Sequence, residues 1–260
     1  MKEKKEKTGS ALSKTEVSKK PHIKGGFPFY GQAVGVLVFN QQGPRVPGDP
    51  GNNFTFQYPV CYEVINGSFS DLIQGSDEIK SKLIHAVDNL YKKGIRGIIG
   101  DCGLMALYQA EMAEKSGMVV LSSALVMIPL VWQLIGRKGS IGILTGHSDL
   151  LSEKHLRAAG WNEDIKITIQ GMQDEPHFTD TVIRGNPNLD VKLMRRDVLN
   201  GAEKLIKKGA KHWPVRAIIL ECSNLATYST DVYREFEIPV FDISAGADLI
   251  QSCVQPRSYI

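Results

Sequence analysis

Short apolar runs rich in β-branched residues alternate along the chain with longer segments whose apolar residues recur every three or four positions. The segment 77–93 has the second pattern, because one helical face carries Ile79, Leu83, Val87 and Leu90. Ser76 before this segment is a suitable N-cap, and Gly94 after it is typical of a helix end. This segment is therefore predicted to be an amphipathic helix.

The same criteria divide most of the chain into strands and helices. Strands are predicted over residues 34–39, 58–65, 95–100, 118–121, 140–144, 165–169, 215–221 and 240–242. Helices are predicted over residues 77–93, 103–115, 124–135, 148–159, 191–208, 223–236 and 245–253, with a long loop over 171–190. Strands that alternate with helices favour parallel sheets covered on both faces, so the predicted fold class is α/β. Ligands of such folds bind beyond the carboxyl ends of the strands, which points to residues 40–53, 101–104, 122–124, 145–148 and 222–225.

Two stretches of the chain resemble each other at a constant offset. Ile98–Tyr108 reads IIGDCGLMALY, and Ile218–Tyr228 reads IILECSNLATY. Each runs from apolar residues through an acidic residue to a cysteine, Cys102 or Cys222, that opens a helical pattern. Val120 and Val240 match at the same offset. The match indicates an internal duplication of a strand–cysteine–helix–strand unit.

Positive charge is concentrated at the N-terminus. The 260-residue chain is 42% hydrophobic and 23% charged, with a formal net charge of +3. Residues 1–24 contain eight lysines and three glutamates, so the remainder of the chain is slightly acidic. This segment has few apolar residues to order it, and we expect a disordered basic tail rather than a secretory signal or transit peptide.

Several function classes lack their sequence signatures. An uninterrupted apolar run of about 18 residues would suggest a membrane span, and no such run is present. Basic patches with interleaved aromatic residues, which would suggest nucleic acid as a partner, are also missing. The cysteines at 61, 102, 222 and 253 form no CxxC pair, and no Walker loop or GxGxxG motif occurs, so we expect neither a metal nor a cofactor. We find no secretory signal in the sequence, and we therefore expect free thiols and a cytoplasmic location.

Both cysteines of the duplicated unit are predicted to lie where a strand ends and a helix begins. Unsatisfied N–H groups and the helix dipole favour an anion there, so the thiol pKa is expected to fall from about 8.5 toward neutrality. If the two halves face each other, Cys102 and Cys222 flank one cleft. One thiolate could then remove a proton from a carbon atom while the other thiol supplies a proton to the opposite face.

The two cysteine corners, GDCG and LECSNLA, and the intervening segment GSIGILTGHSDLLSEKHLRAAGW resemble the aspartate/glutamate racemase superfamily. This superfamily includes aspartate, glutamate and hydantoin racemases, maleate isomerases and arylmalonate decarboxylases. The resemblance covers most of residues 33–255. It implies two pseudo-symmetric parallel-sheet α/β domains with an interdomain active-site cleft, and Cys102 and Cys222 as the catalytic pair on either side of the substrate α-carbon. It also allows a homodimer.

The resemblance implies a crossover of the chain between the domains. In this superfamily the C-terminal segment returns to the first domain. We therefore expect a first domain over 25–123 plus 237–260 and a second domain over 124–236.

The residues after the cysteines depart from the superfamily pattern. Amino-acid racemases usually follow the first cysteine with Asn-Thr, and here Gly103 and Leu104 stand in those places. They usually follow the second cysteine with Thr, and here Ser223 and Asn224 follow it. Gly103, Ser223 and Asn224 remain candidates for binding a substrate carboxylate through backbone N–H groups and a hydroxyl.

Other candidate substrate-binding residues follow neighbouring strands. Thr145 and Ser122 each follow a predicted strand, and Asn40 and Arg45 lie in the Pro- and Gly-rich loop after the first strand. Arg45 is the most accessible cation for an anionic substrate. Asp101 and Glu221 precede the cysteines and are expected to point away from the cleft, where their charge could keep a thiolate strongly basic.

These features favour a cofactor-independent isomerase, namely a racemase or epimerase that inverts a carbon next to the carboxylate of a small molecule. A maleate-isomerase-like or an arylmalonate-decarboxylase-like enzyme on the same fold is an alternative. Arylmalonate decarboxylases keep only the second cysteine, which argues against that branch. A non-catalytic protein that binds small acids is a further alternative, supported by the replacement of Asn-Thr after Cys102.

Overall fold

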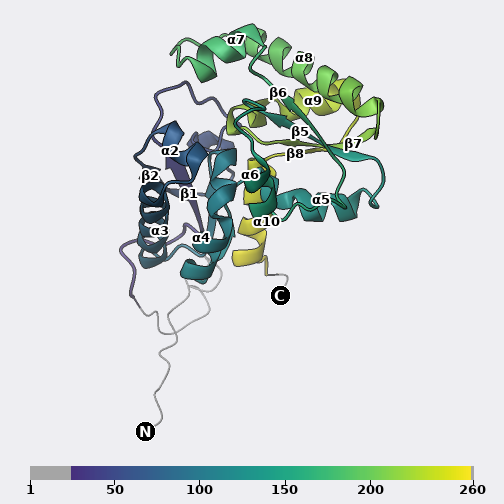
Figure 1. The fold of residues 1–260 in the computed structure, drawn as a ribbon. Coiled ribbons are helices and arrows are strands. Elements are labelled where there is room, and N and C mark those ends of the chain that lie inside the picture. The colour runs from purple at the N-terminus through teal and green to yellow at the C-terminus, as the bar shows by residue number, and fades with distance from the viewer. Residues whose placement is uncertain (1–24, 259–260) are drawn as a thin grey trace.

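The computed structural model describes residues 25–258 and contains two parallel sheets with flanking helices (Figure 1). The strands are β1 Val34–Phe39, β2 Val60–Ile65, β3 Gly97–Gly100, β4 Val119–Leu121, β5 Ser140–Thr145, β6 Ile167–Gly171, β7 Val215–Leu220 and β8 Val240–Phe241. The α-helices are α2 Phe69–Gln74, α3 Asp77–Lys92, α4 Gln109–Ser116, α5 Ile128–Leu134, α6 Glu153–Ala158, α7 Pro176–Phe178, α8 Val191–Ala210, α9 Ser229–Phe236 and α10 Ile243–Val254. The 3₁₀ helices are η1 Asn53–Thr55, η2 Gly103–Tyr108, η3 Ala124–Met127 and η5 Ser223–Tyr228, and η4 Thr179–Ile183 is a π-helix. The predicted disordered tail, residues 1–24, lies outside the described residues.

The two sheets have the same strand order. The first sheet is ordered β2-β1-β3-β4 and the second β6-β5-β7-β8, and all of these strand pairs are parallel. The two matching cysteine stretches occupy equivalent places, one at the end of β3 and the other at the end of β7. The predicted α/β class with two pseudo-symmetric parallel sheets is therefore confirmed.

The C-terminal helix crosses back to the first sheet (Figure 1). Helix α10 packs against β3 and β4, although β8 immediately before it pairs with β7 of the second sheet. The expected domain boundary at residue 237 differs from this arrangement, because the chain leaves the second sheet only after Phe241. This crossover ties the two halves of the molecule together.

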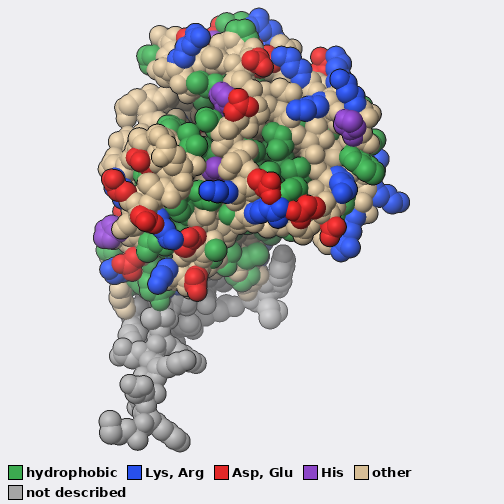
Figure 2. Space-filling view, in the orientation of Figure 1, with side chains coloured by type: hydrophobic (Ala, Val, Ile, Leu, Met, Phe, Trp, Pro, Cys, Tyr) green, Lys and Arg blue, Asp and Glu red, His purple; other side chains and the backbone are tan. Residues whose placement is uncertain are grey.

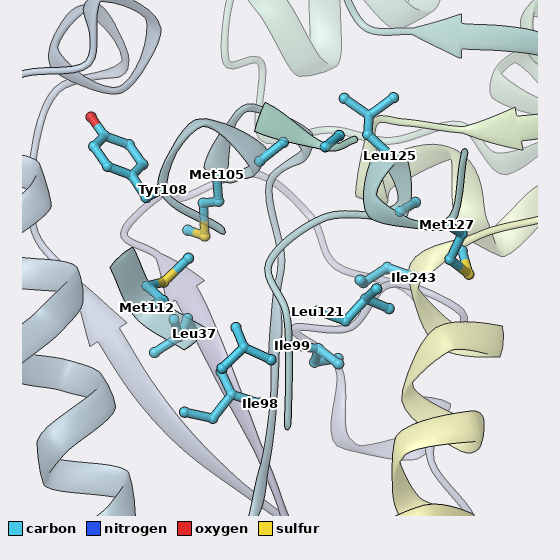
Figure 3. Packing of buried hydrophobic residues seen from close by; sticks show 14 of the residues in the cluster. Leu37, Ile98, Ile99, Met105, Tyr108, Met112, Leu121, Leu125, Met127 and Ile243 are labelled. Carbon is cyan, nitrogen blue, oxygen red and sulfur yellow. The ribbon is translucent and has the colours of Figure 1, made fainter. Parts of the chain in front are cut away.

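The central strand β3 is buried on both faces. Figure 3 shows Ile98 on the same side as Leu37 of β1 and Met112 of α4, while Ile99 lies on the side of Ile243 of α10. All five of these side chains are less than 9% exposed. A parallel strand that helices cover on both faces has a nearly continuous apolar sequence, and this pattern predicts the strand.

Each cysteine stretch leaves its strand as a 3₁₀ helix and becomes an α-helix only afterwards. The N–H of Met105 donates to the carbonyl of Cys102, and the N–H of Leu225 donates to the carbonyl of Cys222, both at 3.0 Å. Single helices over 103–115 and 223–236 were predicted, but the structure divides each into η2 and α4 or η5 and α9. The tighter turns keep the residues after each cysteine close to the edge of its sheet.

The predicted loop over 171–190 contains helix α7 and the π-helix η4. The buried carboxylate of Asp197, on α8, accepts the backbone N–H groups of His177 and Phe178 at 2.7 and 3.1 Å. This cap comes from a helix that follows some twenty positions later, so the local pattern gave no sign of it. It fixes the buried side chain of Phe178 toward the site described below.

The outer face of α8 is rich in Lys and Arg side chains. Figure 2 shows Lys and Arg side chains along the upper right of the molecule, over this helix. Its opposite face buries Met194, Val198 and Leu205, as expected of an amphipathic helix over a sheet. Within residues 25–258, none of the helices combines the length and apolar character needed to cross a membrane.

Candidate active site

A cavity of about 240 Å³ opens where the carboxyl ends of the two sheets meet. Its polar lining comes from the β3–η2 corner at Asp101–Leu104, the β5 end at Thr145–His147 and the β7–η5 corner at Glu221–Asn224. Its apolar lining comes from β1, α2, α7 and η4, through residues Phe39, Phe69, Ile73, Phe178, Val182 and Ile183. A volume of this size suits a small molecule.

Both cysteines of the duplicated unit line this one cavity. Cys102 follows β3, Cys222 follows β7, and both thiols are free and partly buried. The backbone N–H groups of Leu104 and Asn224 oppose part of the rise in the pKa of Cys102 and Cys222 respectively. The Cys222 thiol also donates to the side-chain oxygen of Asn224 at 3.6 Å. The sequence therefore located the pair of thiols that the fold brings together.

The electrostatic setting of these thiols differs from the expectation. Burial raises the pKa of both Cys102 and Cys222, and the Glu221 and Asp101 carboxylates raise both pKa values further. The prediction that a helix start would bring the thiol pKa toward neutrality is wrong for this cavity. Each cysteine begins a 3₁₀ helix of six residues, whose dipole is short, and two buried acids oppose it. The expectation that these acids keep a thiolate strongly basic agrees with the raised pKa of both thiols.

Asp101 and Glu221 line the cavity and do not point away from it as expected. Each directly follows the last residue of its strand, so the strand alternation of side chains no longer applies. Asp101 accepts the backbone N–H of Phe39 at 2.9 Å and an ion pair from Arg45 at 2.6 Å. Burial raises the pKa of Asp101 to about 6, against the opposing charge of Arg45.

Among residues 25–258, hydrogen bonds reach only one of the two carboxylate oxygens of Glu221. The Thr145 hydroxyl donates to its Oε2 at 2.7 Å and the Gly146 N–H at 3.4 Å, while burial raises its pKa. Its Oε1 lies against Gly103, where an added Cβ would be 1.8 Å from that oxygen. Only glycine fits at position 103 while Glu221 holds this place. This contact gives a physical reason for the departure from the Asn-Thr pattern after the first cysteine.

The predicted substrate-binding residues divide into two groups. The structure places Gly103, Thr145, Ser223 and Asn224 in the wall of the cavity beside the two cysteines. It places the other three elsewhere, as the lining of the cavity does not include Asn40, Arg45 or Ser122. The binding roles of the first group remain predictions.

The other three candidates make contacts within the protein instead. Arg45 was expected to be an accessible cation, but its side chain is 13% exposed and ion-paired with Asp49 at 2.8 Å and Asp101 at 2.6 Å. Its charge is therefore balanced by two carboxylates. Asn40 is exposed and donates to Asn66 at 2.7 Å. Ser122 is completely buried between β4 and η3.

Sequence reasoning missed the apolar wall and the ion-pair network. Phe39, Phe69 and Phe178 come from three separate elements, and no local motif marks them as neighbours. Asp49 accepts the side-chain N–H of Asn224 at 3.2 Å and so joins the Arg45 ion pair to the second cysteine corner. In the sequence, only the Pro- and Gly-rich loop after β1 pointed to an ordered structure in this region. Among residues 25–258, no group of three or more His, Cys, Asp or Glu side chains could hold a metal ion.

Comparison with proteins of known sequence finds lyases. The chain is 30% identical over 225 residues to a dimethylsulfoniopropionate lyase of Durusdinium sp. clade D, with 83% of this chain and 73% of that protein covered. It is also 30% identical over 218 residues to dimethylsulfoniopropionate lyase 6 of Emiliania huxleyi (strain CCMP1516). That match covers 81% of this chain but only 56% of the relative, so the chain spans little more than half of that protein. No protein-family model matches.

Comparison with solved structures finds the expected fold. Unliganded arylmalonate decarboxylase superposes with a TM-score of 0.56 at 15% identity, covering 87% of this chain and 94% of that chain. Glutamate racemase isoform RacE1 from Bacillus anthracis gives a TM-score of 0.56 at 12% identity, covering 86% and 83%. The resemblance to aspartate/glutamate racemase-like proteins inferred from the cysteine corners is therefore confirmed at the level of fold.

The function expected from that resemblance is corrected by the sequence comparison. We expected an isomerase of the amino-acid racemase type, but the relatives at 30% identity are named as lyases. Racemases and decarboxylases share the fold at only 12–15% identity, which carries no information on the reaction of this chain. The isomerase expectation is therefore wrong.

Proposed function

This chain belongs to the family of the dimethylsulfoniopropionate lyases, and from that membership we propose that it is itself a lyase of dimethylsulfoniopropionate. The reaction is a β-elimination that releases dimethyl sulfide and acrylate. The observation that carries the proposal is the placement of two free thiols and two buried carboxylates in one small cavity between the halves of the fold. This set supplies a strong base beside a place for a compact, charged molecule.

The elimination needs one base and no redox step. A cysteine thiolate takes the proton from the carbon next to the substrate carboxylate. The electron pair of that C–H bond forms the C=C bond of acrylate, and the pair of the C–S bond leaves with the neutral sulfide. The cysteine then holds the proton as a thiol and releases it to solvent, which restores the base. Atoms and charge balance without any further reactant.

The raised thiol pKa values suit this task. A proton next to a carboxylate is weakly acidic, so a base of high pKa gives a larger driving force for its removal. Burial, Glu221 and Asp101 all raise the pKa of Cys102 and Cys222. A raised pKa also means that only a small fraction of the cysteine is thiolate at neutral pH. A cation bound beside the sulfur would increase this fraction.

The substrate carboxylate needs hydrogen-bond donors away from the two acids. Ser223 lines the cavity, and among residues 25–258 no hydrogen bond of its hydroxyl is found. The ring of His147 lines the same cavity, and its Nδ1 accepts the N–H of Asp149, which leaves Nε2 as a donor. We assign these two groups to the carboxylate end of the substrate. Thr145 is committed to Glu221 and holds that carboxylate in position.

The proposal is tested by measuring dimethyl sulfide in the headspace, and acrylate by NMR, after the full chain is mixed with dimethylsulfoniopropionate. We expect equal amounts of the two products. Cys102→Ser and Cys222→Ser are compared with Cys253→Ser, which changes an exposed cysteine outside the cavity. Loss of the base should lower kcat/KM on the order of 10²- to 10⁴-fold in one of the two site variants. Full activity in both site variants, or no product from the parent chain, would refute the proposal.

A further inference from the structure

The cavity is negatively charged and apolar at once. Asp101 and Glu221 line it, three phenylalanine rings line it, and among residues 25–258 no Lys or Arg side chain does. The nearest arginine, Arg45, is held by Asp49 and Asp101 outside the lining. A site built to hold a simple anion would have the opposite charge. This combination matches a cation whose surface is apolar.

The two carboxylates are not equivalent in what they can offer a ligand. Asp101 uses Oδ1 for the Phe39 N–H and Oδ2 for Arg45, so both of its oxygens are occupied. Glu221 uses Oε2 for Thr145 and Gly146, while Oε1 accepts no hydrogen bond from any residue between 25 and 258. Glu221 is only 6% exposed, but its Oε1 is not completely enclosed by the protein. Because Glu221 lies in the wall of the cavity, this oxygen is the one available to a ligand there.

Gly103 makes room for this oxygen. Any side chain at position 103 would begin 1.8 Å from Oε1 and would displace the carboxylate. Thr145 and Gly146 fix the carboxylate from the other side, through a hydroxyl and a backbone N–H. The charge is thus held in place by three residues from two corners of the site, which is typical of a prepared binding group.

We infer that Glu221 is the specificity-determining residue for a methylated onium cation, which it binds through Oε1 beside the exposed ring of Phe69 in the apolar wall of the cavity. Methylated sulfonium and ammonium groups spread their charge over apolar methyl groups, so they lose little hydration and interact favourably with aromatic faces. Neither group can donate a strong N–H hydrogen bond, and a single fixed carboxylate oxygen with apolar surroundings is sufficient. The site is therefore expected to accept ammonium as well as sulfonium cations.

This inference rests on the proposed function in one respect only, namely that the bound cation is the sulfonium group that leaves as dimethyl sulfide. If dimethylsulfoniopropionate is the substrate, Glu221 holds its sulfonium end while a cysteine acts on the neighbouring carbon. As neutral dimethyl sulfide forms, the attraction to Glu221 is lost, which favours release of that product. Recognition of the cation itself can be measured without any turnover.

The test compares choline with its neutral carbon isostere 3,3-dimethylbutan-1-ol, by isothermal titration calorimetry on the full chain. We expect choline to bind on the order of tenfold more tightly, because a cation in an aromatic site gains about 1–2 kcal/mol. Glu221→Gln should remove most of this difference. Glu114→Gln, which removes one charge from an exposed position, should leave it unchanged. Gly103→Ala keeps the charge of Glu221 but displaces its carboxylate, and it should weaken choline binding while the neutral isostere binds as before.

Two results would overturn the inference. One is equal affinity of the parent chain for choline and the neutral isostere, and the other is an undiminished preference for choline in a folded Glu221→Gln variant. The test also separates this inference from the proposed function. Cleavage of dimethylsulfoniopropionate without any preference for choline sinks the inference alone. A clear preference for choline without cleavage supports the inference and counts against the lyase.

Discussion

At the scale of single residues, Glu221 would connect the proposed recognition of a cation with the basicity of the thiols. Its carboxylate faces the cavity, and after burial it is the largest cause of the raised pKa of both Cys102 and Cys222. A cation bound to Glu221 cancels that charge and so lowers the thiol pKa. In the proposed reaction, a substrate cation bound to Glu221 would therefore help to generate the thiolate that removes its proton.

The first prediction concerns the pH dependence of the reaction. The base is active only as a thiolate, and burial together with Glu221 and Asp101 raises its pKa above the usual range of a thiol. The value of kcat/KM should therefore rise with pH about tenfold per unit on the alkaline side of neutrality. Glu221→Gln removes a like charge, so its rising limb should lie on the order of one unit lower in pH. A rate that is independent of pH between 7 and 9 in the parent chain would contradict this assignment of the base.

The second prediction concerns the glycine that follows Cys102. Gly103→Ala forces Glu221 out of position, and the cost of a misplaced group in a prepared site is on the order of 10- to 100-fold in kcat/KM. Gly43→Ala is a suitable control, because an added Cβ there meets nothing closer than 4.0 Å. The melting temperature of both variants shows whether folding is affected. Equal activity of Gly103→Ala and Gly43→Ala would mean that the Glu221 contact has no catalytic consequence.

At the scale of elements, sequence reasoning was strongest where the apolar pattern decides the structure. The buried strands β3 and β7 and the amphipathic helices α3 and α8 were all predicted, with their ends displaced by one or two residues. It failed over 171–190, where the carboxylate of Asp197, which lies some twenty positions away, accepts the first N–H groups of α7. The placement of Arg45 failed for a similar reason, because its partner Asp101 is 56 positions away. Contacts between distant elements leave no periodic signal in the sequence.

The third prediction concerns the ion pair that joins the loop after β1 to β3. Arg45→Met leaves the buried carboxylates of Asp49 and Asp101 without their cationic partner, since their side chains are 2% and 1% exposed. Removing one partner of a buried ion pair costs about 3–5 kcal/mol in the free energy of unfolding. Arg157→Met removes an exposed arginine that pairs with Glu153 and Glu163, and such pairs contribute less than about 1 kcal/mol. Urea unfolding measures both, and similar losses in the two variants would contradict the role of the buried pair.

At the scale of the whole molecule, the fold was predictable because the duplicated cysteine unit specifies it twice. The two sheets have equal strand orders, and this agrees with the sequence repeat formed by the stretches that contain Cys102 and Cys222. The site was only partly predictable. The sequence identified the thiols and four residues of the cavity wall, whereas the aromatic wall depends on how two halves and η4 come together. The proposed reaction rests on relatives at 30% identity, because proteins with different activities share this fold.

The fourth prediction concerns the crossover of the chain. Ile250 of α10 is 4% exposed and packs over Gly97 of β3, whereas Leu249 beside it is 52% exposed. Ile250→Ala should lower the free energy of unfolding by about 2–4 kcal/mol, because it leaves a cavity against the first sheet. Leu249→Ala should change it by less than about 0.5 kcal/mol. Equal effects of the two substitutions would show that α10 does not contribute to the core of the first half.

The most direct test of the whole proposal is the rate of dimethyl sulfide release from dimethylsulfoniopropionate that carries deuterium on the carbon next to its carboxylate. A cysteine thiolate that breaks this bond in the elimination predicts slower release from the deuterated substrate than from ordinary substrate, with one acrylate formed per dimethyl sulfide. The slowing should disappear when deuterium is placed only on the methyl groups of the sulfonium. Release of dimethyl sulfide without acrylate, or no release at all, would contradict the assignment of this cavity to a lyase.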